Sequence, residues 1–289
     1  MLGGMPVRLQ MNWESIEHYF IDGVRNLVSI KTIVFRDTEQ SMRLLAKDLN
    51  IPFSELCRGK VTQCEIGQNI RVNVPATEII PKIVDYGHIQ RKLIKDETVY
   101  FNGKAKKVII YDKLAEISAR GNKSKRGAMR LLKEKGYHFL RIEFKLFNQK
   151  SFNQSDMRHI STIGDIIIHF PNLYEFWIYQ LSRLVLFSRI ENDLQNMTKN
   201  EYLIGLGMNH VGFEKFVEDY QILCKSKTEK GLKSARSKAY KEVLDVLEKY
   251  GSKKEYNKKF LSIDIAKHLL RKSKEEEIDI PFLFLNLWR

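Results

Sequence analysis

Hydrophobic and polar residues alternate along two segments of the chain, residues 62–74 and residues 137–147. Alternation over this length is typical of a β-strand with one face in the core and one polar face. In the second segment the polar positions include Arg141, Glu143 and Lys145. Both segments are therefore predicted to be strands of a sheet with charged side chains on one side.

Shorter patterns extend this sheet and add helices. Residues 98–101 and 107–111 are rich in β-branched and aromatic residues and flank Asn102-Gly103, a dipeptide that favours a hairpin turn. A further strand is expected over residues 27–35. Helices are expected over residues 38–48, 76–84 and 126–135, with a loop at residues 121–125.

The second half of the chain has helical periodicity instead. Hydrophobic residues recur every three or four positions in four segments: residues 172–190, 200–223, 234–250 and 262–274. These patterns predict an α+β fold, with an antiparallel sheet in residues 1–190 and a basic, mostly helical region in residues 191–289.

The distribution of charged residues predicts what kind of partner the protein binds. Lys and Arg number 49 against 35 Asp and Glu, a net charge of +14. Residues 101–150 hold 14 basic and four acidic side chains, and residues 222–274 hold 16 basic and six acidic. A surplus gathered in two blocks indicates a polyanionic partner, either nucleic acid or an anionic membrane surface.

The hydrophobic runs and the cysteines bear on where in the cell the protein is located. No apolar run reaches the roughly 18 residues of a membrane-spanning helix. No segment combines a strongly apolar helix face with a cationic one, which disfavours a peripheral membrane protein. Cys57, Cys64 and Cys224 show no CxxC spacing, which argues against a zinc site or a disulfide framework. A reducing, cytoplasmic location is therefore expected.

Candidate chemistry lies on the polar faces of the predicted strands. The chain has no phosphate loop ending in GK[ST], no GxSxG, no HExxH and no His-x-His. What remains is Tyr111, Lys113 and Glu116 in YDKLAE, and Arg141 and Glu143 in RIEFK. If the two strands are neighbours, Glu116 and Glu143 can hold Mg²⁺ or Mn²⁺ through oxygen ligands. Lys113 and Arg141 are then placed to grip a phosphate.

These motifs resemble those of the rolling-circle replication initiators, which include the filamentous-phage replication proteins and the staphylococcal type of plasmid Rep protein. Y-x-K-x-x-E from Tyr111 is followed by R-x-E-x-[KR] from Arg141. Upstream, CEIGQNIRVNVPATEIIPKI is similar to the E-x-G-x-N strand and following segment of the phage members. The resemblance covers residues 29–150.

The resemblance implies a Rep-type nicking core in residues 1–190. Such a protein cuts one DNA strand at a replication origin with a tyrosine and closes the strand after synthesis, while a divalent metal polarises the scissile phosphate. The candidate catalytic residues are Tyr111, Lys113, Arg141 and Lys145. The candidate ligands of Mg²⁺ or Mn²⁺ are Glu116, Glu143, Asp112 and Glu65.

One position departs from the family pattern. In the plasmid proteins the nucleophilic tyrosine lies nine residues after the glutamate of the RxE strand, and this chain has Phe152 there. Either the nucleophile comes from elsewhere in the chain, or the alignment shifts, or this protein does not nick. Tyr111 is the tyrosine inside the motif, either as the nucleophile or as a packed strand residue. Should Tyr111 be excluded, the next candidates are Tyr86, Tyr100 and Tyr174. The alternative function is a non-catalytic DNA-binding regulator of replication or copy number that keeps the Rep scaffold.

The strand charges also have structural interpretations. Charged residues on an exposed strand face are commonly solvated, and cross-strand charge pairs are frequent. Asp112 is expected to face away from Tyr111 and Lys113, so a turn-forming role competes with metal binding. Glu65 shares its strand face with Asn69, and a solvated role competes with metal binding there too.

The two basic blocks supply candidate contacts to DNA phosphates, although a merely soluble surface would look similar. The candidate residues are Lys123, Lys125, Arg126 and Arg130 in the first block and Lys233, Arg236 and Lys238 in the second.

The expected partner is origin DNA, single- and double-stranded. A host helicase and a second copy of the chain, in a homodimer, are further candidate partners. Residues 200–220 and the next helix give a weak helix-turn-helix signal.

Overall fold

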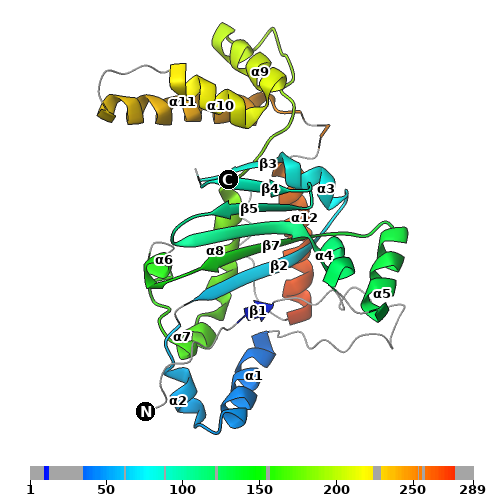
Figure 1. Ribbon diagram of the computed structural model, residues 1–289, viewed down its shortest axis with the longest axis vertical. Coiled ribbons are helices and arrows are strands. Elements are labelled where there is room, and N and C mark those ends of the chain that lie inside the picture. Colours follow the sequence, from blue (N-terminus) through cyan, green and yellow to red (C-terminus); the bar gives the residue numbers. More distant parts are fainter. Residues whose placement is uncertain are drawn as a thin grey trace. The chain divides into compact units, whose positions relative to one another are not determined.

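The computed structural model describes residues 10–12, 35–61, 63–87, 89–120, 123–153, 157–223, 229–252, 254–255 and 258–276 (Figure 1). It divides into two compact units. The first unit comprises Met1–Pro81, Asp85–Leu184 and Ser262–Arg289, and the second comprises Lys82–Val84 and Val185–Leu261. Along the sequence, the second unit is thus inserted between parts of the first.

A six-stranded sheet forms the centre of the first unit. In spatial order its strands are β1 (Gln10–Asn12), β2 (Cys64–Val72), β7 (His138–Leu146), β6 (Lys106–Asp112), β5 (Thr98–Asn102) and β4 (Arg91–Ile94). β1 runs parallel to β2, and the other neighbours are antiparallel. The predicted α+β class with an antiparallel sheet is confirmed.

Two helices cover one face of this sheet, α8 (Phe170–Ser182) and α12 (Lys258–Glu276) (Figure 1). Trp177 of α8 donates from Nε1 to the carbonyl oxygen of Ile142, 3.3 Å away. His268 of α12 lies 3.2 Å from Oε1 of Gln68. Gln68 and Ile142 are directly opposed in register, so both helices contact the same face. We call it the helix-covered face, and its buried positions include Ile70 and Phe144.

The opposite face carries α4 (Lys113–Arg120) and α5 (Lys123–Glu134) at one end. Leu114 of α4, Leu132 of α5 and Phe139 of β7 form one buried cluster. Phe139 alternates with the core positions of β7, so this cluster anchors both helices on the second face, which we call the polar face. Up to β8, the described residues also form α1 (Phe35–Asp48), α2 (Phe53–Cys57), α3 (Ala76–Ile79), a 3₁₀ turn (Ile80–Lys82), α6 (Gln149–Asn153), α7 (Ile163–Ile168) and a two-stranded sheet of β3 (Ile83–Tyr86) and β8 (Leu184–Leu186).

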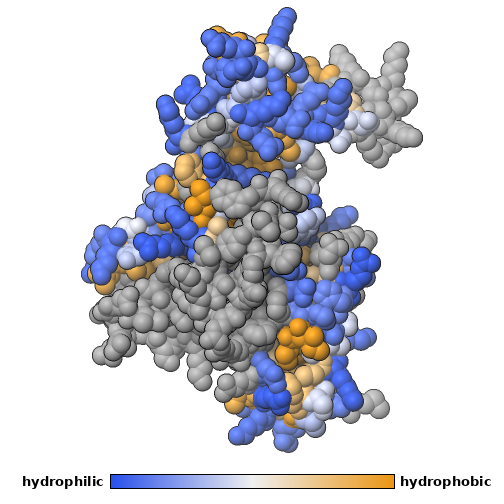
Figure 2. All heavy atoms as spheres, turned by 180° about the vertical axis from the view of Figure 1, so that it is seen from behind, coloured by the Kyte–Doolittle hydropathy of each residue, from blue (hydrophilic) through white to orange (hydrophobic). Residues whose placement is uncertain are grey.

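The second unit is mainly helical. It contains α9 (Lys199–Val211), α10 (Phe213–Leu223) and α11 (Glu229–Tyr250). Thr198 begins α9 with a capping box, in which its side chain and that of Glu201 bond each other's backbone N–H groups. The helices share a core that includes Ile204, Met208, Phe213, Val243 and Val246. Hydrophilic side chains cover most of the described surface of this unit in the view of Figure 2.

Several predicted elements are confirmed. The alternating segments form β2 and β7, the hairpin forms β5 and β6, and helices occur at α1, α11 and α12. Gly121 and Asn122 of the expected loop lie outside the described residues, but Lys123 already begins α5. Of the strand expected at residues 27–35, residues 27–34 also lie outside them, and Phe35 begins α1.

Other boundaries are corrected by local geometry. The helix expected at residues 76–84 ends at Ile79 and passes through the 3₁₀ turn into β3. The helix expected at residues 172–190 ends at Ser182, and β8 follows. The helix expected at residues 200–223 is broken at Gly212, whose φ of +82° is in a region that side chains rarely adopt.

The division at residue 190 also needs correction. The first unit ends its central stretch at Leu184 and resumes at Ser262. Asp264 of α12 accepts a hydrogen bond from Asn73 Nδ2 at 2.7 Å, and His268 contacts Gln68. Most of α12 is therefore part of the sheet domain, because its buried side chains complete the core of the helix-covered face.

Candidate functional site

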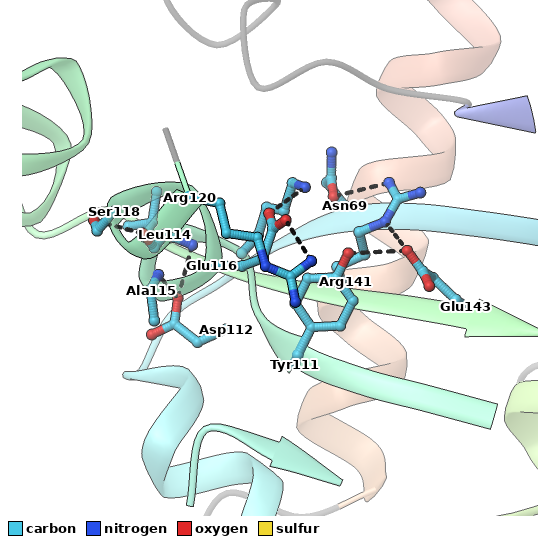
Figure 3. Close-up of polar contacts among 11 residues, drawn as sticks. Asn69, Tyr111, Asp112, Leu114, Ala115, Glu116, Ser118, Arg120, Arg141 and Glu143 are labelled. Atoms are coloured by element: carbon cyan, nitrogen blue, oxygen red, sulfur yellow. Dashed lines mark hydrogen bonds and ion pairs between the residues drawn. The ribbon is translucent and has the colours of Figure 1, made fainter. Parts of the chain in front are cut away.

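Three adjacent strands bring five of the eight predicted catalytic and metal-binding residues onto the polar face. Arg141 of β7 lies opposite Asn69 of β2 on one side and opposite Tyr111 of β6 on the other. Glu143 lies opposite Gly67. Directly opposed residues share a sheet face. These side chains therefore project to the side away from α8 and α12 and meet there (Figure 3).

Glu143 is the centre of a buried network. Its Oε1 accepts hydrogen bonds from Arg141 Nε at 2.6 Å and from the Tyr111 hydroxyl at 2.9 Å. Arg141 also donates from Nη1 to Asn69 Oδ1 at 3.2 Å. Arg141 is 2% exposed and Glu143 is 4% exposed. Both charges are withdrawn from solvent, and each requires the other for compensation.

A second carboxylate stands beside Glu143. Lys145 Nζ lies 2.6 Å from Glu65 Oε2 and 3.6 Å from Glu143 Oε2, so one ammonium bridges two carboxylates. Burial, followed by the negative charge of Glu143, raises the pKa of Glu65. Burial acts in the same direction on Glu143. The Arg141 guanidinium, the Tyr111 hydroxyl and Lys145 together outweigh it and hold the pKa of Glu143 below its ordinary value. Carboxylates with pKa values pushed apart are frequent in functional sites.

Gly67 leaves the space that two of these side chains occupy. A Cβ atom at this position would lie 3.0 Å from Arg141 Nη2 and 3.0 Å from Glu143 Cγ. The E-x-G-x-N pattern thus has a local explanation, because Glu65 pairs with Lys145, Gly67 leaves room and Asn69 accepts from Arg141. The sequence prediction did not name Gly67 or Asn69 as site residues, although this pattern was their signal.

The first turns of α4 carry further predicted residues (Figure 3). Lys113 Nζ pairs with Glu116 Oε2 at 2.7 Å, and Arg120 Nη1 lies 3.8 Å from Glu116 Oε1. Burial lowers the pKa of Lys113, against the opposing effect of its hydrogen bond to Glu116. Burial also raises the pKa of Tyr111, and the charges of Glu143 and Glu116 add to this while Arg141 opposes it.

Asp112 caps helix α4. Its Oδ1 accepts hydrogen bonds from the backbone N–H groups of Leu114 at 2.8 Å and Ala115 at 3.0 Å. A carboxylate at this place satisfies N–H groups that have no partner within the helix. The contacts of Asp112 are those of the turn-forming interpretation.

The two carboxylates that were predicted to share a metal have separate partners. Glu116 pairs with Lys113, whereas Glu143 pairs with Arg141. The chain leaves β6 after Asp112 and turns into α4, which carries Glu116 off the strand. The carboxylate that shares an ammonium with Glu143 is instead Glu65, on the neighbouring strand β2.

The position nine residues after Glu143, where the resemblance to plasmid Rep proteins would place a tyrosine, is occupied by a core residue. Phe152 lies in α6 and is fully buried. Of the other candidate tyrosines, Tyr86 is also fully buried and donates from its hydroxyl to Gln180 Oε1. Tyr100 is half-buried and lies opposite Ile109, on the polar face. Among these tyrosines, Tyr111 is the one whose hydroxyl contacts the charged network.

The first basic block adjoins this network through α5. Arg126 and Arg130 are exposed on that helix, and Arg130 Nε lies 3.5 Å from Glu134 Oε1. Lys123 and Lys125 lie in the first turn of α5, but the structure does not describe their side chains.

The second basic block lies on α11, where Lys238 is exposed. Lys233 and Arg236 also belong to α11, but their side chains are not described. α10 carries three acidic side chains and one lysine, and a single residue, Gly212, separates it from α9. The weak helix-turn-helix signal of residues 200–220 and the next helix falls on α9, α10 and α11. Residues 224–228, which join α10 to α11, lie outside the described residues, so this signal stays a prediction.

No family model, no curated protein and no solved structure matches this chain. Among the residues that the structure describes, no group of three or more His, Cys, Asp or Glu side chains is arranged to hold a metal ion. Within the same residues, no helix has both the length and the apolar character to cross a membrane.

Proposed function

We propose that this protein is a rolling-circle replication initiator that nicks and rejoins one strand of origin DNA. The observation that supports this most is the buried network in which the Tyr111 hydroxyl, Arg141 and Lys145 converge on Glu143. It contains a nucleophile, a proton acceptor and cations on one sheet face, which are the parts that phosphodiester transfer requires. Lys113 adds a further cation, because its Nζ lies over the ring of Tyr111, 5.7 Å from the centroid.

The neighbouring carboxylates fit a hard divalent cation. Mg²⁺ is commonly bound through one or two carboxylates, with substrate phosphates and water as its other ligands. Glu65 and Glu143 are the residues that would hold Mg²⁺ or Mn²⁺, because they already share the positive charge of Lys145. When bound, the ion supplies positive charge beside the phosphate oxygens.

In the proposed step, the Tyr111 oxygen attacks the phosphorus atom. The raised pKa of Tyr111 means that its hydroxyl is protonated at neutral pH, so the proton must leave during attack. Glu143 Oε1, 2.9 Å away, is placed to accept it. A tyrosine–phosphate bond forms as the bond to the DNA 3′ oxygen breaks, and Lys113, whose pKa is lowered, donates a proton to that oxygen. The reverse sequence rejoins the strand.

The surface charge supports binding of a long polyanion. Exposed Arg126 and Arg130 on α5 lie on a helix that packs against the same polar face. Cations at this place can contact phosphates that flank the scissile one, which positions the strand without reading its sequence. α11 supplies a second candidate phosphate-contacting surface in the other unit.

A second candidate function rests on Phe152. It is a fully buried phenylalanine in α6, so no hydroxyl nucleophile is present at the position where the plasmid Rep proteins carry theirs. This observation favours the non-catalytic alternative, a DNA-binding regulator of replication or copy number on the same scaffold. In that case the network around Glu143 maintains the sheet and has no chemical role.

Nicking of supercoiled plasmid that carries the cognate origin separates the two candidates. The wild type is expected to produce open circles with a protein-linked 5′ end in the presence of Mg²⁺ or Mn²⁺. Glu143→Gln keeps the shape of the side chain and deletes its charge, and we expect a loss of about 100-fold or more in rate. Glu78→Gln changes an exposed carboxylate on α3 and serves as the matched control, with no expected effect.

Each outcome assigns a role. If Glu143→Gln nicks as fast as the wild type, Glu143 is not part of the chemistry. If the wild type binds origin DNA but never nicks with either metal, the regulator is the correct function. If Tyr111→Phe still forms the covalent adduct, the nucleophile is another tyrosine. Tyr100 would be examined first because it lies on the polar face, before Tyr86 and Tyr174.

A further inference from the structure

A second cluster of charged and polar groups lies on the helix-covered face of the same sheet. Lys106, at the start of β6, is opposed to Leu146 in register and faces α8. Its Nζ lies 3.3 Å from Oε1 of Gln180 in α8. Lys106 Nζ and the guanidinium carbon of Arg183 both lie over the ring of Tyr86, 5.2 Å and 5.4 Å from its centroid.

The two cations of this cluster have no acidic partner among the described residues. The contacts of Lys106 are with the Gln180 amide oxygen and the Tyr86 ring, and the contact of Arg183 is with the same ring. Both side chains are half-buried. By comparison, the buried Arg141 on the polar face is paired with a carboxylate. Two adjacent positive charges repel each other, so an anion between them would be bound favourably.

Gln180 adds a buried donor beside these cations. It is 1% exposed, and its Oε1 accepts hydrogen bonds from both the Tyr86 hydroxyl and Lys106 Nζ. These contacts use the amide oxygen, while the amide N–H donors have no hydrogen-bond partner in the described part of the chain. Buried polar groups are nearly always paired, so an unpaired donor here indicates a missing acceptor.

We propose that Lys106, Arg183 and the Gln180 amide form a binding site for a phosphate group. Phosphate supplies the negative charge that the two cations lack and an acceptor oxygen for the amide. The planar guanidinium and the ammonium point charge are the two side-chain groups that proteins use most for phosphate. The source is either a phosphodiester of DNA or free phosphate. The site is on the other face from the Glu143 network and does not depend on the nicking function.

The energetics of Lys106 fit a ligand site. Burial, together with the positive charge of Arg183, lowers the pKa of Lys106 to about 8. The fold thus disfavours the charge that this lysine carries at neutral pH. The groups that face it are Gln180 of α8, Arg183 directly after the end of α8, and Tyr86 of β3. A bound phosphate reverses the balance because it gives the ammonium a counter-charge.

Titration calorimetry on the full chain tests the site, with inorganic phosphate as the probe and chloride of equal ionic strength as the blank. We expect phosphate binding by the wild type, weakened about tenfold or more in Lys106→Met and in Arg183→Gln. Lys106→Met is expected to keep or raise the melting temperature without phosphate, which separates a defect in binding from a defect in folding. Arg183→Gln provides the second, independent variant.

Lys107→Met is the matched control. Lys107 is the next residue along β6, is also half-buried, and lies over the ring of Tyr100 at 4.7 Å from the centroid. It points to the polar face, opposite Lys145. Its replacement should leave the affinity for inorganic phosphate unchanged.

A single-stranded oligonucleotide then identifies the source of the phosphate. If it competes with inorganic phosphate, and both variants lose affinity for it, the site takes a phosphodiester of the DNA backbone. If it does not compete, the site takes free phosphate. The proposal is overturned if wild type, Lys106→Met and Arg183→Gln show the same affinity for both probes. Because no nicking is measured, failure here leaves the proposed function intact, and the reverse also holds.

Discussion

The two faces of the six-stranded sheet hold charge in opposite ways. On the polar face, Arg141 and Lys145 are matched by Glu143 and Glu65. On the helix-covered face, Lys106 and Arg183 both lie over the ring of Tyr86. No carboxylate pairs with either cation in the part of the chain that is described. The first arrangement is balanced by its own side chains, whereas the second becomes balanced when an anion binds.

This difference predicts opposite responses to the loss of one charge. Removing a member of a balanced buried set leaves its partner without compensation, which is strongly destabilising. Removing one of two like charges relieves repulsion. A ligand must displace an existing contact on the polar face, since Lys145 already bridges the two carboxylates. On the helix-covered face, an anionic ligand would bind between Lys106 and Arg183 without displacing a carboxylate.

The largest expected effect is on Arg141. Arg141→Met leaves Glu143 buried with its charge uncompensated, and we expect a loss of about 3–5 kcal/mol in the free energy of unfolding. Urea denaturation followed by circular dichroism measures this, with Lys106→Met as the counterpart that should be neutral or stabilising. A loss below about 1 kcal/mol, the range of surface ion pairs, would contradict the balanced-network interpretation.

A smaller effect is expected from filling the space beside Arg141. Gly67→Ala places a Cβ atom 3.0 Å from two side chains of the network, and overpacking of this kind costs about 1–3 kcal/mol. Gly127→Ala is the control, because a Cβ atom there meets nothing within 4 Å and the residue lies in helix α5. The control should gain about 0.5–1 kcal/mol of stability. Equal effects at the two glycines would show that the network tolerates displacement.

The basic helix beside the polar face is expected to affect binding more than stability. Reversing Lys123, Lys125 and Arg126 to Glu should weaken DNA binding. It should also flatten the dependence of log K on log salt by about 0.9 for each phosphate that the protein no longer neutralises. Stability should change by no more than about 0.5 kcal/mol. Arg58→Glu, an exposed cation outside the basic block that pairs with Glu55, is the control. An unchanged affinity and slope would remove α5 from the DNA-binding surface.

The smallest expected effect is a slope of stability with pH. The pKa of Lys106 is about 8 in the folded protein against an ordinary 10.5. Between these values the unfolded chain binds more protons at this lysine, so its contribution to stability rises with pH across that window. Melting curves of wild type and Lys106→Met should therefore converge as the pH increases. Parallel curves would show that Lys106 titrates normally in the fold.

A good part of the fold was predictable from the sequence because the strands have local signals. Alternation along β2 and β7 identified both strands, and Asn102-Gly103 marked the β5–β6 hairpin. The sequence does not show that the strands of Tyr111 and Arg141 are neighbours, whereas the register of β6 and β7 places these two residues opposite each other.

The features that the sequence did not predict depend on contacts between residues that are far apart in the chain. The partner of Glu143 was expected to be Glu116, but a single turn from β6 into α4 redirected Glu116 and left Glu65 beside Glu143. Lys106 and Arg183 gave no signal at all, because only the packing of α8 on the sheet brings them to the same ring. Composition revealed an excess of positive charge without revealing where it is buried.

The position of α12 has a consequence for the order in which the protein can fold during synthesis. Its contacts with β2 and the residue that follows it join positions 191 and 200 residues apart, from Asp264 to Asn73 and from His268 to Gln68. The sheet of the first unit is therefore synthesised early but lacks one of its covering helices until the ribosome has also produced the whole second unit. Contacts with such long loops form slowly. The second unit, whose helices are nearly continuous in sequence, is thus expected to reach its native structure before the first unit does.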